Sequence, residues 1–71
     1  LREDCVEIDY TNYRGERKSY IILPQKLEFR EAPPYHKDKQ WILTAWVFGR
    51  DVTREFAVQS IHSWRPVLVK L

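Results

Sequence analysis

The first apolar segment of the chain, residues 5–11 (CVEIDYT), alternates between apolar and polar side chains from Val6 onward. Its apolar residues fall on one side of an extended chain, namely Val6, Ile8 and Tyr10. A period of two predicts a half-buried β-strand. Residues 12–16 (NYRGE) then predict a turn, with Gly15 as the natural position for a positive φ angle.

The second apolar segment keeps the same alternation over an unusual length, from Lys18 to Arg30. A strand of this length in a small domain must bend, and Pro24 lies in its middle. Proline donates no hydrogen bond to a sheet, so it belongs at an edge or at a β-bulge. We therefore predict a strongly bent second strand with its bend at Pro24.

The middle of the chain predicts a loop followed by a buried strand. Residues 31–39 (EAPPYHKDK) show no periodicity and contain two adjacent prolines, which favours a loop. Residues 40–48 (QWILTAWVF) fit a buried helix or a buried strand by periodicity alone. The segment is short and six of its nine residues are β-branched or aromatic, which favours a strand.

In the last third of the chain, the pattern of residues 53–64 is compatible with a helix or a strand. Its apolar positions also fit a helical stripe, with Asp51 or Thr53 as the N-cap. The turn formed by Gly-Arg-Asp directly before it favours a hairpin, and so a strand over residues 52–61. Residues 66–71 (PVLVKL) predict a last short strand.

Together these segments predict one all-β domain spanning residues 1–71, a small five-stranded barrel or sandwich. Closure into a barrel is physically favourable because it removes exposed strand edges. The ten aromatic residues would supply much of the core of so short a chain.

Composition indicates the cellular compartment and the charge distribution of the protein. The lone Cys5 excludes an intramolecular disulfide, and no apolar stretch is long enough to span a membrane, so we expect a cytoplasmic protein. The chain starts at Leu1 and contains no methionine, which indicates an excised domain. The net charge is only +2, but bases dominate between Arg14 and Lys39.

Four stretches in sequence order carry a family resemblance: YTNYRGE, ILP, HKDKQWILTAW and TREFAVQSI. The chain resembles the WYL domain, a small Sm/SH3-like β-barrel found in bacterial transcription regulators and phage-defence proteins. Residues 41–43 (Trp-Ile-Leu) stand at the Trp-Tyr-Leu run, and residues 54–56 match the Arg-x-Phe stretch of the next strand. The resemblance covers residues 6–61, and the sequence contains no counterpart of the family's N-terminal DNA-binding helices.

The resemblance implies a regulatory, ligand-sensing module of bacterial or phage origin. Such domains are thought to recognise nucleotides or single-stranded nucleic acid through a basic, aromatic-lined surface. Sm/SH3-like barrels also assemble into oligomers or serve as docking platforms for proteins. Both functions therefore remain open at this point.

Cationic side chains supply the first group of candidate binding residues. Arg14 and Arg17 flank the first turn with Lys18, where they could clamp phosphate oxygens or simply solvate a hairpin. Arg54 occupies the first position of the Arg-x-Phe stretch, and on a strand it would point to the same face as the apolar Phe56. A charge on that face needs a ligand or an ion pair with a carboxylate such as Asp51 or Glu28.

A second group of candidates combines aromatic rings with cations, namely Tyr35, His36, Lys39 and Trp41. Bases of single-stranded nucleic acid stack on such rings while the backbone meets the charges. Alternatively, Trp41 and Trp46 fill the core, and His36 is a hydrogen-bonding residue that fixes the proline loop.

Catalytic and metal chemistry find no support in the sequence. The two histidines and Cys5 lack the spacing of metal ligands, and no serine lies in a nucleophile elbow. Two glycines are too few for a phosphate-binding glycine loop. We therefore expect a binding module without cofactor, not an enzyme. Its partner would be nucleic acid or a nucleotide; the alternative is a protein partner or a second copy bound at an exposed strand edge.

Overall fold

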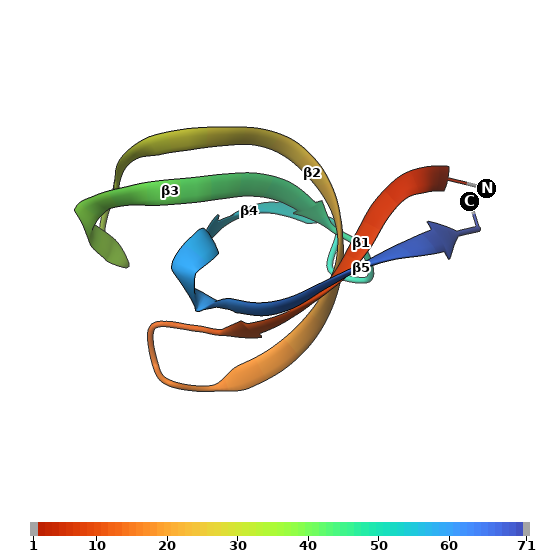
Figure 1. The fold of residues 1–71 in the computed structure, drawn as a ribbon, viewed down its shortest axis with the longest axis horizontal. Coiled ribbons are helices and arrows are strands. Elements are labelled where there is room, and N and C mark those ends of the chain that lie inside the picture. Colours follow the sequence, from red (N-terminus) through yellow and green to blue (C-terminus); the bar gives the residue numbers. More distant parts are fainter. Residues whose placement is uncertain (1, 71) are drawn as a thin grey trace.

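Five antiparallel strands form a single sheet in the computed structural model, which describes residues 2–70 (Figure 1). The strands are β1 (Arg2–Thr11), β2 (Arg17–Ala32), β3 (His36–Val47), β4 (Val52–Ala57) and β5 (Ile61–Val69). A 3₁₀ turn, η1 (Val58–Ser60), joins the last two strands. The order across the sheet is β4-β3-β2-β1-β5, which confirms the prediction of an all-β, five-stranded fold. Within the described range no helix has the length and apolarity to cross a membrane.

The long strand β2 bends at a β-bulge, as the sequence predicted. Pro24 pairs with Ala45 and Lys26 pairs with Thr44, so Gln25 has no partner on β3. Because of the extra residue, odd-numbered residues after the bulge lie on the face that even-numbered residues occupy before it. Ile22 before the bulge and Leu27 after it therefore face the same side of the sheet although their parities differ, because their partners are Val47 and Leu43.

The turns differ in part from the sequence prediction. Residues 12–16 form the expected turn, in which the side-chain oxygen of Asn12 accepts hydrogen bonds from two backbone N–H groups and Gly15 has a φ of +82°. The predicted loop over residues 31–39 is wrong, because only residues 33–35, with a cis peptide between the prolines, separate β2 from β3. The first residues of β3 are polar on both faces, so they carry no alternation that could reveal a strand.

Residues 53–64 adopt the strand alternative, interrupted only by η1. The last strand is longer than predicted, since β5 begins at Ile61 instead of residue 66. Register explains the difference: Ile61, Ser63 and Trp64 pair with β1, and such long-range pairing leaves no local signal in the sequence.

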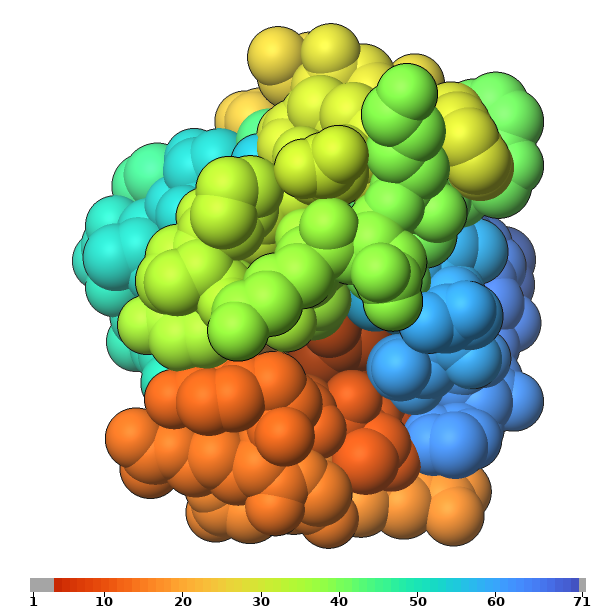
Figure 2. Space-filling model, turned by 90° about the vertical axis from the view of Figure 1, so that its left-hand side faces the viewer, coloured from red at the N-terminus to blue at the C-terminus, as the bar shows by residue number. Residues whose placement is uncertain are grey.

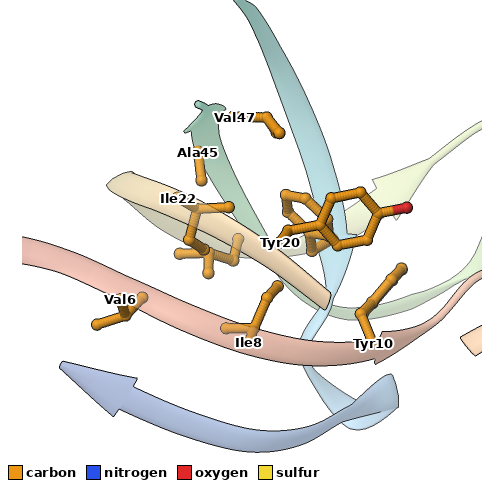
Figure 3. Close-up of a cluster of buried hydrophobic side chains, with 9 residues drawn as sticks. Val6, Ile8, Tyr10, Tyr20, Ile22, Ala45 and Val47 are labelled. Carbon is orange, nitrogen blue, oxygen red and sulfur yellow. The ribbon is translucent and has the colours of Figure 1, made fainter. Parts of the chain in front are cut away.

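The inner face of the curled sheet carries nine buried residues (Figure 3). They come from four strands: Val6, Ile8, Tyr10, Tyr20, Ile22, Leu43, Ala45, Val47 and Phe56. The ring of Phe56 meets Tyr10 edge-on at 4.9 Å and lies 5.5 Å from Tyr20. The hydroxyl of Tyr10 accepts a hydrogen bond of 3.0 Å from the backbone N–H of Ala57, and burial raises the pKa of this phenol.

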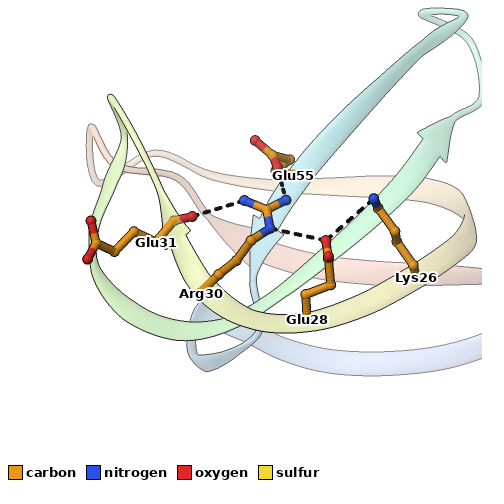
Figure 4. A network of polar contacts seen from close by, with 5 residues as sticks. All are labelled: Lys26, Glu28, Arg30, Glu31 and Glu55. Carbon is orange, nitrogen blue, oxygen red and sulfur yellow. Dashed lines mark hydrogen bonds and ion pairs between the residues drawn. The ribbon is translucent and has the colours of Figure 1, made fainter.

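The predicted closure into a barrel is wrong, because the sheet curls without closing. Strands β4 and β5 lie at opposite ends of the strand order, and no ladder of hydrogen bonds joins them in the described part of the chain. On the outer face, Arg30 binds the carboxylates of Glu28 and Glu55, and Lys26 lies 3.5 Å from Glu28 (Figure 4). Arg30 and Glu55 thereby connect β2 to β4 across β3.

Candidate anion-binding site

A cavity of about 360 Å³ opens where three turns meet at one end of the sheet. Its walls come from the turns at residues 12–16, 33–35 and 48–51, together with the neighbouring ends of the strands. The cavity lining includes four cations, Arg14, Lys18, Arg50 and Arg54. It also includes four tyrosines, Tyr10, Tyr13, Tyr20 and Tyr35, but a single carboxylate, Glu16. We call this space the arginine cavity.

Arg54 reaches the cavity from the inner face of β4, where it lies opposite Ala45 of β3. Its guanidinium carbon lies 5.4 Å from the ring centre of Tyr20 and 5.7 Å from that of Phe56. One guanidinium nitrogen donates a long hydrogen bond of 3.4 Å to the Tyr20 hydroxyl. The alternative of an ion pair is wrong, since no carboxylate of the described residues lies within 4.0 Å of Arg54. Aromatic faces stabilise such a cation without neutralising it.

Arg50 approaches the same tyrosine from the turn between β3 and β4. Gly49 has a φ of +89° and Asp51 has a φ of +53°, so the chain reverses sharply here. The reversal places the guanidinium carbon of Arg50 5.6 Å from the Tyr20 ring centre. Two guanidinium groups therefore lie against one ring, and this local excess of positive charge favours a bound anion.

The tyrosines of two turns complete the wall of the cavity. The rings of Tyr13 and Tyr35 lie 4.4 Å apart with a tilt of 33°, which brings the first turn against the second. Arg14 donates a hydrogen bond of 3.1 Å to the Tyr13 hydroxyl, and this bond raises the pKa of the arginine. Lys18 lies 4.0 Å from Glu16, so one cation of the cavity has an acidic neighbour at long distance.

The structure brings four of the seven candidate residues together at the arginine cavity, namely Arg14, Tyr35, His36 and Arg54. His36 makes no side-chain hydrogen bond to any described residue, so the structure does not support its proposed role in fixing the turn. Arg17 lies elsewhere: its guanidinium donates three hydrogen bonds of 2.7, 2.9 and 3.0 Å to the carboxylate of Asp9. This contact lowers the pKa of Asp9, and it makes Arg17 a partner of β1 instead of a cavity residue.

Lys39 and Trp41 line a separate cavity of about 340 Å³, together with Phe29. The core alternative for Trp41 is wrong, because 52% of the residue is exposed. Its ring packs edge-to-face on Phe29 at 5.4 Å. Trp46 is half-buried, on the side of β3 opposite to the core cluster.

Arg50, Tyr13 and Tyr20 are cavity residues that the sequence analysis did not select as candidates. Arg50 lies in the turn after Gly49 and Arg54 lies four residues further along, in β4, and this spacing of two arginines is a weak signal that the sequence analysis did not use. The sequence analysis gave Tyr20 no role, and nothing local in the sequence places two arginines on its ring.

Comparison with known protein families, curated proteins and solved structures gave no match to this chain. In the part of the chain that the structure describes, no three histidine, cysteine or acidic residues lie close enough to hold a metal ion.

Proposed function

We propose that this domain is a regulatory binding module that recognises nucleic acid or a nucleotide-type anion at the arginine cavity. One observation carries the proposal: four cations line a cavity that contains a single carboxylate, and three of them, Arg14, Arg50 and Arg54, contact rings instead of acids. Guanidinium groups bind phosphate oxygens through paired hydrogen bonds. The tyrosines of the wall would contact a base or a sugar.

The resemblance to WYL domains supports the same proposal. Arg54 stands at the Arg-x-Phe position of that family, and it lines the cavity. A ligand-sensing role without catalysis is what the resemblance implies, and the cavity offers charge and aromatic surface for that role.

Titration of a fluorescent oligonucleotide at low salt tests the proposal. Affinity should fall with salt by a log–log slope of about −0.7 for each phosphate contact with a single strand. The double variant Arg50→Gln/Arg54→Gln should lower the affinity at least roughly tenfold, because each charge-assisted contact contributes substantially.

The matched control is the double variant Arg17→Gln/Arg65→Gln. It removes the same charge from two exposed arginines that bind Asp9 and Glu7 away from the arginine cavity. The control should change the affinity far less. Absence of binding near about 50 mM salt, or an equal loss in both double variants, would refute the proposed function.

A second candidate function is a protein contact at the free edge of β5. Among the described strands it pairs with β1 alone, and it exposes Trp64 and Leu68. Strand addition to such an edge is a common mode of protein recognition and self-association. Sedimentation velocity across micromolar concentrations tests the self-associating version, in which Leu68→Lys should dissociate the oligomer. A monomer at every concentration would exclude it.

A further inference from the structure

A cavity of about 480 Å³ lies beside the arginine cavity and shares only three residues with it, Lys18, Tyr20 and Arg50. Its walls come from the start of β2, from Glu7 of β1 and from the end of β3 with the turn that follows. In Figure 2 this turn (blue-green) lies next to the first turn (orange), after which β2 begins. We call this space the β2 cavity.

The β2 cavity exists because β3 ends before it covers the start of β2. The last pair between the two strands joins Ile22 to Val47, and one further backbone hydrogen bond of 3.0 Å runs from Phe48 to Ile21. The chain then turns toward β4. Residues 17–20 of β2 therefore pair with β1 on one side and with no described strand on the other.

The floor of the β2 cavity is apolar. It consists of Ile21, of which 37% is exposed, half-buried Phe48 and the buried Val47. Of the lining residues only Glu7 carries a carboxylate, and Arg65 binds that group. A ligand on this floor would be held by burial of apolar surface and would meet no unpaired acid.

Two exposed cations, Lys18 and Arg50, line the same cavity. No carboxylate of the described residues lies within 4.0 Å of Arg50, and Lys18 lies 4.0 Å from Glu16. Both cations can therefore accept a further anionic partner. Apolar surface next to two such cations favours an amphipathic ligand with one compact negative charge, which is the chemistry of a carboxylate on a hydrocarbon chain.

We propose that the β2 cavity binds a small monocarboxylate with an apolar body, a medium-chain fatty acid. Lys18 and Arg50 bind the carboxylate, and the hydrocarbon chain lies on Ile21 and Phe48. The inference goes beyond the proposed function, because this ligand is neither a nucleotide nor a nucleic acid and its apolar part lies outside the arginine cavity.

The test titrates the ¹⁵N-labelled protein with acetate, butyrate, hexanoate and octanoate at neutral pH and low salt, followed by amide NMR shifts. Affinity should rise roughly two- to fourfold for each added methylene, because full burial of one methylene corresponds to about fourfold and the floor is partly exposed. The largest shifts should belong to Ser19, Ile21 and Gly49, which line the cavity. Octanamide, which lacks the charge, should bind roughly tenfold more weakly than octanoate.

Charge variants test the role of the two cations. Lys18→Gln/Arg50→Gln should lower the affinity for octanoate roughly tenfold and leave that for octanamide unchanged. The matched control, Arg17→Gln/Lys39→Gln, removes one arginine and one lysine that do not line the cavity, so it should change neither affinity by more than about twofold.

A variant of the floor tests the apolar contact separately. Ile21→Ala should lower the affinity for octanoate roughly three- to tenfold and leave acetate unaffected. Leu27→Ala is the control, since Leu27 is exposed on the same strand outside the cavity. Circular dichroism establishes that each variant is folded.

Three results would overturn the inference: no binding of octanoate at about 10 mM, equal affinities for octanoate and octanamide, or shifts spread over amides far from the β2 cavity. Each of these leaves the proposed function standing, because the oligonucleotide titration is a separate measurement with a different ligand.

Discussion

Arg54 and Arg30 show how differently one residue type can be accommodated in this small sheet. Arg30 binds two carboxylates, Glu28 and Glu55, on the outer face. Arg54 lies on the inner face against the rings of Tyr20 and Phe56, and among the described residues its side chain donates one long hydrogen bond, to the Tyr20 phenol. A charge that is withdrawn from water without a counter-ion costs free energy, and a bound anion would compensate that cost.

Replacement of each arginine by methionine separates these two situations. In the absence of ligand, Arg54→Met should leave the free energy of unfolding unchanged or raise it by up to about 1 kcal/mol, because methionine keeps the packing and removes the unneutralised charge. Arg30→Met should lower the urea midpoint, because Glu55 then loses its cation and Glu28 keeps only Lys26. Urea denaturation followed by tryptophan fluorescence measures both. A clear loss of stability in Arg54→Met would assign the arginine a structural role.

At the scale of elements, Pro24 predicted the bend, residue types and the turn before residue 52 predicted β3 and β4, and alternation alone predicted β1 and β2. It failed at the start of β3, where residues 37–39 are exposed and polar, so that no face can be distinguished. The candidate site was also only partly predictable from the sequence. Arg14, Tyr35, His36 and Arg54 stood out by residue type, whereas Arg50 joins them only through the curl of the sheet, which depends on long-range pairing.

The bulge at Gln25 can be tested by deleting this residue. Deletion removes the reversal of parity, so Leu27 and Phe29 would exchange faces with Glu28 and Arg30 or force a shift of register against β3. We expect a loss of at least about 3 kcal/mol in the free energy of unfolding, as in other severe disruptions of packing. Gln25→Ala keeps the bulge and removes only an exposed side chain, so its urea curve should stay close to that of the parent. Equal stability of the deletion variant would show that the bulge does not set the register.

At the scale of the whole molecule, the small net charge of +2 conceals a separation of charge. Four carboxylates outside the arginine cavity are bound by three arginines, namely Glu7 by Arg65, Asp9 by Arg17, and Glu28 and Glu55 by Arg30. These pairs neutralise the outer face and the β1–β5 side of the sheet. The arginine cavity retains its cations with a single acid, so its field remains positive although the total charge is nearly balanced.

The same pairing determines how the fold responds to acid. Hydrogen bonds from Arg17 and Arg30 lower the pKa of Asp9 and of Glu28 below their ordinary values of 3.8 and 4.5. As the pH falls, the unfolded chain therefore takes up protons at a higher pH than the folded chain does. The contribution of both carboxylates to the free energy of unfolding is complete above about pH 5, and it is lost as the pH falls through their lower pKa values in the folded chain. We expect the urea midpoint to be independent of pH near neutrality and to fall in acid. The variant Asp9→Asn/Glu28→Gln should have a lower midpoint at neutral pH and a shallower fall. If its fall is as steep as that of the parent, the acid response must come from other carboxylates.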